Sequence, residues 1–413
     1  MSPYKTLQQL YHRDSSPKRQ AHIDAEARRR LESESTFRLG VEIDAGELFL
    51  AVPRELTLLN ERVLRVERKI SLLWNGLPGI ARWAYVRGLI LDEIISSNEM
   101  EGVHSSRKQV AAALKVAEVR ERGHEVARFK EFAKLYLGLT DKNLVYPKEP
   151  GDIRTIYDAV VAGELHEKEL PDGMLFRTDT VEVLSTAGRV LHTGVSPESK
   201  ITSMITQMIG LVASEEIPAT YTALVSHFLF EYIHPFYDGN GRTGRYLLAL
   251  YLSKPLSQTT VLSLSRVIAE HKDKYYKAFD ATEGMLNHAE VTYFVIQMME
   301  LIRTAQDELI INLEQKRNQL HHAAAQLPIF KEEPFALSSK AVSVLHILVQ
   351  NRLFGTPLGV ELHELSQELE LGMQTARKYT LELENAHLIT PTAKKPLKFT
   401  LTDKADTIFG FTR

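Results

Sequence analysis

The 413-residue sequence contains no cysteine, and this absence excludes several classes of protein. Disulfide frameworks, thiolate metal sites and cysteine nucleophiles all need the missing side chain, so any catalysis must use oxygen or nitrogen groups. Long apolar runs are also absent, because no stretch approaches the roughly 20 residues of a membrane span. The N-terminus lacks the apolar segment of a secretory signal. We therefore expect a cytoplasmic protein without membrane partners.

The chain also has little excess of either sign of charge, since its formal net charge is −3. Such a chain is not built as a whole to bind polyanions. Its length predicts roughly two to three domains. Changes in sequence texture predict a polar lead-in over 1–40, a segment of amphipathic helices over 41–115, a central helical domain over 116–328 and a compact tail over 335–413.

Helical periodicity dominates the chain and predicts a mainly α fold, a helical bundle. Apolar residues recur every three or four positions over 55–102, where Gly102 can end the helix. The segment FRTDTVEVLSTAGRVLH instead alternates, with a turn at Ala187-Gly188, and predicts a short hairpin. It is the only hairpin that we predict ahead of the tail.

The last long helix, predicted over 289–327, carries a stripe of leucines at Leu309, Leu313 and Leu320. Such a stripe can pack inside the chain or form the seam of a homodimer. We favour packing inside the chain, and the homodimer stays as the alternative.

The most informative stretch, HPFYDGNGRTGR, runs from His234 to Arg245 between two apolar helical segments. Gly239 and Gly241 let the backbone approach a phosphate closely, and the start of the following helix adds positive potential. Arg242 and Arg245 share a face of the first helical turn, so they can reach different phosphates of one polyphosphate. The stretch therefore predicts a triphosphate site.

Two further side chains of this stretch suit phosphate chemistry. Asp238 precedes the glycines, where a carboxylate can hold Mg²⁺ against phosphate oxygens. His234 is the one group here that can accept a proton near neutral pH. A lone histidine at a helix end is more often structural, so the prediction depends on the whole set.

Every fixed position of the Fic signature H-P-F-x-D-G-N-G-R-x-G-R is present between His234 and Arg245, so the stretch resembles the Fic family. The hairpin resembles the Fic flap, and SRVIAEHKDKYYKAFDA resembles the helix that follows the Fic active site. Residues 45–110 resemble the N-terminal segment of larger Fic proteins. The resemblance covers about 40–300 of the chain.

The resemblance implies a protein adenylyltransferase, in which His234 deprotonates a Tyr, Thr or Ser hydroxyl of a target protein. That hydroxyl attacks the α-phosphorus of ATP, and pyrophosphate leaves. Asp238 would hold Mg²⁺ between the α- and β-phosphates. The backbone of 239–241, with Asn240, would stabilise charge on the transferred group.

The remaining parts of the nucleotide site are also implied by the resemblance. Arg242 and Arg245 would grip the β- and γ-phosphates, and Phe236 would anchor the loop in the core. Tyr275 and Tyr276 lie where Fic proteins line the adenine pocket.

The segment SNEMEG, from Ser97 to Gly102, matches the Fic inhibitory pattern [ST]-x-x-x-E-[GN]. Ser97 and Glu101 lie on one helical face, so a single helix edge can present the carboxylate. By resemblance, Glu101 pairs with Arg245 and keeps ATP in a nonproductive pose. The alternative to an inhibitory segment is a solvated helix tip without a role. Another possibility is that Glu101 helps to remove AMP from a modified target.

The predicted flap has two interpretations. The strand edge at Thr180, Val181, Glu182 and Val183 can pair with an extended target segment and bring its hydroxyl to His234. The hairpin can also simply cover the nucleotide.

The tail predicts three helices and a two-stranded wing, the pattern of a winged helix. Basic and acidic side chains are balanced in it, and Arg377 and Lys378 of the predicted recognition helix are offset by Glu382 and Glu384. The basic footprint of a DNA-binding module is missing, although Lys395 and its neighbours on the wing could touch phosphates. We favour protein docking over DNA binding.

Two rival functions stay open. One is a transcriptional regulator whose central domain only senses a nucleotide. The other is a phosphotransferase toxin of the Doc type, which is disfavoured because such toxins alter the Gly-Asn-Gly-Arg and second-arginine positions that this sequence keeps.

Overall fold

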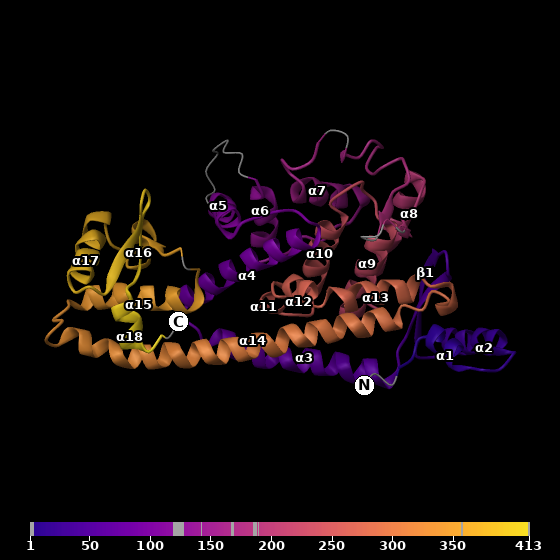
Figure 1. The fold of residues 1–413 in the computed structure, drawn as a ribbon, viewed down its shortest axis with the longest axis horizontal. Coiled ribbons are helices and arrows are strands. Elements are labelled where there is room, and N and C mark those ends of the chain that lie inside the picture. Colours follow the sequence, from indigo (N-terminus) through magenta and orange to yellow (C-terminus); the bar gives the residue numbers. More distant parts are fainter. Residues whose placement is uncertain are drawn as a thin grey trace. The chain divides into compact units, whose positions relative to one another are not determined.

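The computed structural model describes residues 4–118, 128–141, 143–166, 169–184, 188, 190–356 and 358–411. The chain divides into two compact units, Met1–Arg68 with Ile90–Asp307 and Lys69–Leu89 with Glu308–Arg413. Three long helices have residues in both units (Figure 1): α3 (Arg54–Asn75), α4 (Gly79–Met100) and α14 (Thr292–Gln326). The turn between α3 and α4 is therefore grouped with the tail, which differs from the division predicted from sequence texture.

The first unit is mainly helical, and the expected fold class is confirmed. Its helices, besides parts of the three long ones, are α1 (Leu7–Arg13), α2 (Arg19–Leu31), α5 (Arg107–Glu118), α6 (Lys130–Gly138), α7 (Pro150–Val160), α8 (Glu198–Ala213), α9 (Ala219–Ile233), α10 (Asn240–Leu252), α11 (Gln258–Val261), α12 (Leu264–Glu270), α13 (Lys272–Glu283) and the 3-10 turn η2 (Met285–Asn287). None of the described helices has an apolar run long enough to cross a bilayer.

Helices α9 and α10 form the centre of this unit. Nearly every residue of both is buried, as expected of sequences that are apolar on all sides, ATYTALVSHFLFEYI in α9 and RYLLALYL in α10. They pack against each other, and α8 packs against α9. The loop between them is thus held at both ends by rigid, buried helices.

The N-terminal region is more ordered than a polar lead-in. Helices α1 and α2 pack together around Leu7, Ile23 and Ala27. Arg30 of α2 forms a buried ion pair with Glu290 at 2.9 Å. The polar composition of 1–40 did not predict these contacts.

A second hairpin precedes the flap, so the prediction of a single hairpin ahead of the tail was wrong. Strand β1 (Thr36–Ile43) pairs antiparallel with β2 (Gly46–Ala51), and a register shift interrupts the pairing between Arg38 and Glu42. The β1 sequence itself alternates, with apolar Phe37, Leu39, Val41 and Ile43, so the signal for this strand was present and was overlooked. Phe49 extends the contact through hydrogen bonds with Ala289 and Val291.

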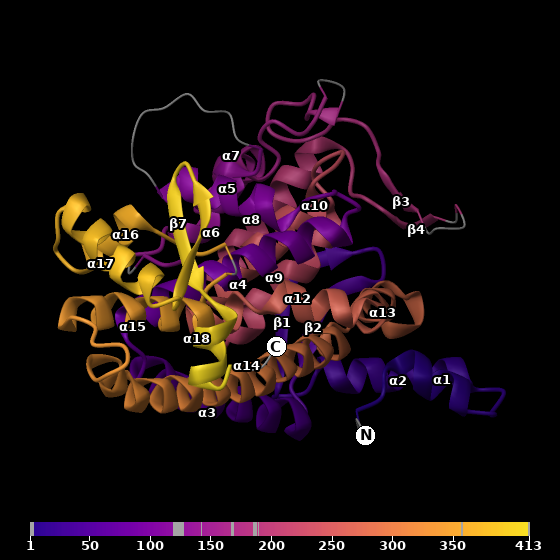
Figure 2. The same cartoon turned by 60° about the vertical axis from the view of Figure 1, so that its left-hand side comes forward.

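The predicted flap is present as β3 (Glu182–Leu184) and β4 (Val190–Thr193), paired antiparallel. Figure 2 shows the two strands extending outward from the helices of their unit. At the base of the hairpin the Gly194 amide donates to the Val181 carbonyl at 2.9 Å. Gly188 takes the left-handed conformation expected of the turn, whereas Ala187 lies outside the described residues.

The second unit contains the predicted three helices and a hairpin. Its elements after α14 are η3 (Leu327–Lys331), α15 (Ser339–Phe354), β5 (Val360–Glu361), α16 (Leu362–Glu368), α17 (Met373–Asn385), β6 (Ile389–Lys394), β7 (Leu397–Leu401) and α18 (Asp403–Phe409). The strands form one antiparallel sheet in the order β5-β7-β6. Strand β5 and helix α18 were not predicted. Leu309, Leu313 and Leu320 of α14 are buried within the chain.

Candidate nucleotide-binding site

The signature stretch lies where its apolar flanks predicted, between the end of α9 and the start of α10. His234 ends α9 in the left-handed conformation, with φ of 51°, and its amide still donates to the Phe230 carbonyl at 3.0 Å. Gly239 also has positive φ, 80°, and precedes the first residue of α10. These two turns bring the loop back across the helix ends, so the histidine and the start of α10 face the same region.

The loop is anchored by Phe236 and Asn240. The Phe236 ring is fully buried and stacks on Tyr157 with centroids 3.6 Å apart. The Asn240 side chain accepts from the Phe236 amide at 3.0 Å and donates to the Phe236 carbonyl at 2.8 Å. The side chain of Asn240 is thus engaged by the loop itself, which leaves its backbone amide as the group that can face a ligand.

The first turn of α10 offers backbone amides to an anion. The N–H groups of 240, 241 and 242 have no carbonyl partner within the helix, and no side chain in the described part of the chain caps them. Together with the helix dipole they form a site for negative charge. The sequence prediction of an anion site is compatible with this geometry.

Arg245 is buried and held by the tip of α4. Its Nε donates to Ser97 Oγ at 2.9 Å, and an Nη2 donates to the Ser97 carbonyl at 2.9 Å and to Glu101 Oε1 at 2.8 Å. Arg245 is 2% exposed and Glu101 24% exposed. Burial works to lower the pKa of Arg245, but Glu101, Tyr275 and Glu231 together outweigh it and the pKa is raised.

The Glu101 carboxylate also lies directly over the start of α10. A Cβ added at Gly241 would be 2.1 Å from Glu101 Oε1. Gly102 ends α4 with φ of 68°, and the Val103 amide turns back to the Asn98 carbonyl at 2.9 Å. The carboxylate therefore occupies space beside the free amides where a phosphate would need to approach.

Arg242 has a carboxylate partner of its own, which the sequence did not reveal. Its Nη1 donates to Glu164 Oε2 at 2.9 Å, and the two side chains are 1% and 4% exposed. Arg128 approaches the same oxygen at 3.5 Å. In this structure Arg242 fastens α10 to the loop that follows α7, and reaching a phosphate would require it to leave Glu164.

The His234 ring is held in a defined tautomer. Its Nδ1 lies 3.3 Å from the Glu231 carbonyl, so Nδ1 carries the proton and Nε2 keeps its lone pair. Burial lowers the pKa of His234 to about 4, and the nearby cations His192 and Arg177 act in the same direction. The ring is therefore neutral at pH 7 and able to accept a proton.

A buried arginine that the sequence did not single out supports this histidine. Arg177 is fully buried and donates to the carbonyls of His234 and Val195, each at 2.8 Å. It also donates to the Asp179 carbonyl at 2.5 Å. Arg177 thus joins the residues before the flap, the residues after it and the end of α9.

Asp238 is exposed and its Oδ1 accepts from the Gly239 amide at 2.5 Å. The described residues contain no group of three or more His, Asp or Glu side chains that could hold a metal alone. Mg²⁺ is commonly bound by one or two carboxylates together with substrate phosphates and water. A single exposed carboxylate beside an anion site fits that mode.

The two tyrosines predicted at the adenine pocket face in different directions. Tyr275 is 2% exposed, and its hydroxyl bonds to Nε2 of His227 at 2.8 Å, inside the core. Tyr276 is 48% exposed and its ring lies edge-on to Tyr275, with centroids 5.3 Å apart. Tyr276 is therefore the one of the pair that can present its ring to a ligand.

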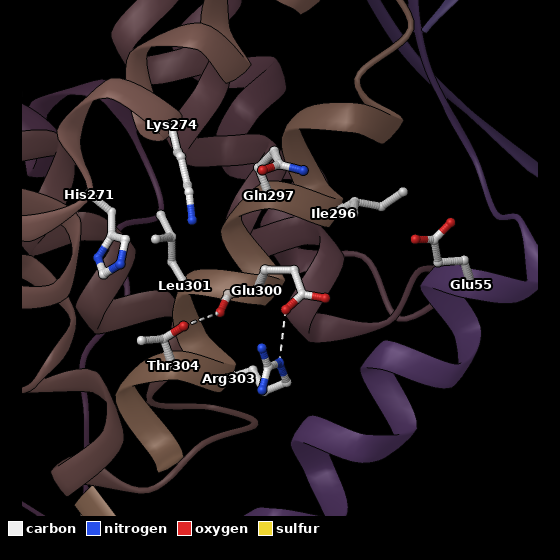
Figure 3. Close-up of a pocket in the computed structure, with 9 residues that line it drawn as sticks. All are labelled: Glu55, His271, Lys274, Ile296, Gln297, Glu300, Leu301, Arg303 and Thr304. Carbon is white, nitrogen blue, oxygen red and sulfur yellow. Dashed lines mark hydrogen bonds and ion pairs between the residues drawn. The ribbon is translucent and has the colours of Figure 1, made fainter. Parts of the chain in front are cut away.

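A separate cavity of about 430 Å³ lies between the start of α3, α13 and α14 (Figure 3). Its charged lining includes His271, Lys274, Glu300 and Arg303, and Arg303 already donates to Glu300 at 2.8 Å. None of the predicted site residues lines it. The chemistry predicted from the signature thus belongs to the α9–α10 loop and not to this cavity.

The α9–α10 loop thus combines free amides at a helix start, a neutral histidine and two buried arginines. Together they form a candidate nucleotide-binding site. Residues 148–252 match the Fic/DOC family model. The matched region extends from just before α7 through the flap to the end of α10.

Three solved structures of Fic proteins are similar to this chain to different degrees. A Fic family protein from Desulfovibrio desulfuricans is similar, with 18% identity and a TM-score of 0.52 over 85% of this chain and 97% of that chain. A Fic domain containing signaling protein from Bacteroides thetaiotaomicron has 17% identity and a TM-score of 0.41, over 60% and 97%. Fic-1 from C. elegans has 18% identity and a TM-score of 0.43, over 63% and 74%. The first of these matches supports the assignment of the fold.

Proposed function

We propose that this protein is an adenylyltransferase that moves AMP from ATP to a Tyr, Thr or Ser hydroxyl of a target protein and releases pyrophosphate. The observation that carries the proposal is the Glu101 carboxylate, which lies beside Gly241 in the first turn of α10 and is bonded to Arg245. A helix start and an arginine suit an anion, so a carboxylate beside them supports a phosphate site there.

His234 acts as the general base in this proposal. With Nδ1 bonded to the Glu231 carbonyl, its free Nε2 accepts the proton of the target hydroxyl. The hydroxyl oxygen then forms a bond to the α-phosphorus, and the bond from that phosphorus to the bridging oxygen of the β-phosphate breaks. Pyrophosphate carries away the electron pair, and His234 keeps the proton until the product leaves.

The loop stabilises the charge that develops during transfer. The amides of 240–242 face the phosphates, and Arg245, once released by Glu101, binds the terminal phosphates. Asp238 would hold Mg²⁺, which when bound neutralises part of the phosphate charge. Arg242 is bonded to Glu164 and stabilises the loop, so its contact with phosphate requires the exchange of one anion for another.

Glu101 is the built-in inhibitor. ATP must compete with a carboxylate that is already bonded to Arg245 and sits beside Gly241. The helix tip that carries Glu101 is fixed by Ser97, whose hydroxyl and carbonyl bind the same arginine. Removal of the Glu101 side chain would leave both the arginine and the amides open to the nucleotide.

The flap would present the target segment. Val190 and Leu191 of β4 are exposed, and the short strands have unpaired edges that can accept an extended chain. In the tail, Arg377 of α17 pairs with Glu384 at 2.9 Å and lies over the Phe399 ring. Because Arg377 is already paired within the tail, protein docking is favoured over DNA binding.

The test uses ATP labelled at the α-phosphate, with Mg²⁺, and follows the intact mass of the protein and of lysate proteins. Wild type, Glu101→Gly and Glu101→Gly/His234→Ala are compared. We expect a gain of one AMP that rises strongly in Glu101→Gly and disappears when His234 is also replaced.

Glu99→Gly is the matched control, because Glu99 lies at the same helix tip but is exposed and carries the same loss of helix propensity. It should behave as wild type. A mass gain of one phosphoryl group without the α-phosphate label would instead support a phosphotransferase. Bound ATP without any transfer in all forms would support a nucleotide sensor and contradict the proposal.

A further inference from the structure

Two of the last carbonyls of α9 accept hydrogen bonds from the flap and the residues just after it. The Val195 amide, just after β4, donates to the Ile233 carbonyl at 3.1 Å. The His192 Nε2, within β4, bonds to the Tyr232 carbonyl at 2.7 Å. Because helix ends leave such carbonyls without intrahelical partners, these contacts fasten the flap to the end of the helix that leads to His234.

Both ring nitrogens of His192 face acceptors. Nε2 faces the Tyr232 carbonyl, and Nδ1 lies 2.8 Å from Oε2 of Glu283 in α13. A neutral imidazole has a single N–H, whereas a carboxylate and a carbonyl can only accept. His192 makes both hydrogen bonds only when both nitrogens are protonated, so the geometry requires the imidazolium.

The groups around His192 favour a positive charge. Glu283 faces it from α13, and Asp44 contributes from the turn between β1 and β2. The C-terminal end of α9 adds the negative end of the helix dipole. Burial opposes the charge, but Glu283, the Tyr232 carbonyl and Asp44 together outweigh it, so the pKa of His192 is raised above its ordinary value of 6.5. Tyr232 and His234 are the titratable groups that approach from α9 and its C-terminal end.

We propose that His192, as an imidazolium, is a positioning residue that holds flap strand β4 against the end of α9 and so fixes the docking edge relative to His234. The ring centroids of His192 and His234 are 6.4 Å apart. The charge on His192 also disfavours a second proton on His234, which helps to keep the general base neutral. The catalytic part of this inference rests on the proposed adenylyl transfer, whereas the structural part does not.

Hydrogen exchange of peptides that cover β4 tests the structural part in the unmodified protein. The rates are corrected for intrinsic chemistry and compared at pH 6 and pH 9. Over this interval His234, with a pKa of about 4, and Tyr232, with a pKa of about 12, keep their protonation states. We expect exchange at least tenfold faster at pH 9, because His192 loses one of its two protons. Peptides of the buried α10 serve as the reference and should not change.

Two substitutions separate the charge from simple packing. In Glu283→Gln the amide can donate to Nδ1 while Nε2–H still donates to the Tyr232 carbonyl, so a neutral ring can make both bonds and exchange should stay slow at both values of pH. His192→Gln cannot span both partners and should exchange rapidly at both. Slow, pH-independent exchange in the unmodified protein would overturn the proposal.

The catalytic part is tested in the Glu101→Gly background with a defined target protein. His192→Gln should raise KM for the target severalfold, leave KM for ATP unchanged and move the acidic limb of the rate profile to higher pH, because His234 has lost a neighbouring cation. An unchanged acidic limb and target KM would refute it. If no form transfers AMP but β4 exchanges as expected, the proposed function fails and the role of His192 in holding the flap stands.

Discussion

A single methyl group at Gly241 tests whether Glu101 and a phosphate compete for the same space. Its Cβ would lie 2.1 Å from Glu101 Oε1 and 2.9 Å from an Nη of Arg245. Both distances are far inside normal contact, so Gly241→Ala must displace the carboxylate. In the Glu101→Gly background the first clash is absent, and alanine is a better helix former than glycine.

The expected energies follow from these contacts. Breaking a buried ion pair costs ~3–5 kcal/mol, and alanine returns up to ~1 kcal/mol of helix propensity. Gly241→Ala alone should therefore lose ~2–4 kcal/mol of unfolding free energy, which lowers the melting midpoint by roughly 3–7 °C. In Glu101→Gly only the contact with the guanidinium of Arg245 remains, and this group can shift because Glu101 no longer holds it, so the same methyl should be close to neutral, within ~1 kcal/mol. Calorimetry on wild type, Gly241→Ala, Glu101→Gly and the double variant measures the difference between the two effects of the methyl group.

Binding of a nonhydrolysable ATP analogue completes the experiment. The methyl should prevent close approach of phosphate to the α10 amides in both backgrounds, although the inhibitory contact is gone in each. Normal analogue binding by Gly241→Ala/Glu101→Gly would show that phosphate does not occupy this position. Additive changes in stability would refute the contact between residues 241 and Glu101.

Two further predictions concern histidines. AMP transfer by Glu101→Gly should persist at pH 5 and fall as the pH drops through about 4, because protonation of His234 removes the lone pair of the base. Initial rates measure this, with circular dichroism to verify folding. Loss of rate near pH 6.5 would contradict the prediction. Tyr275→Phe should leave Nε2 of buried His227 without its 2.8 Å partner and destabilise the fold by ~1–3 kcal/mol. Its transfer rate per folded molecule should be unchanged, and a large rise in KM for ATP would instead place Tyr275 at the nucleotide.

The sequence was sufficient to predict those parts of the site where a chemical motif and the helical periodicity point to the same residues. The loop from His234 to Arg245 lies between two apolar helices as predicted, and Ser97 and Glu101 share the helical face that meets Arg245. Here glycine, helix-end and spacing rules each constrain the same few residues. The flap was found for a similar reason, since its alternation contrasts with helices on both sides.

Partners that are distant in sequence left no such signal. Glu164 and Arg242 are a buried pair brought together only by the packing of the loop after α7 against α10. Arg177 binds backbone carbonyls, which every residue possesses, so no side-chain pattern marks its partners. Tertiary contacts, and not local preference, decide these features. The β1–β2 hairpin is a different case, because β1 alternates from Phe37 to Ile43 and a local signal for it was present but overlooked.

The position of Glu101 on the tip of α4 makes the proposed inhibitor a tethered ligand. Its effective concentration at Arg245 is fixed by the covalent chain and its hydrogen bonds, and is independent of how much protein is present. Dilution or overexpression would leave the fraction of locked sites unchanged. The nucleotide concentration, or any contact that alters the geometry of the helix tip, would shift that fraction. The balance between the inhibited and the open site is therefore a property of a single molecule.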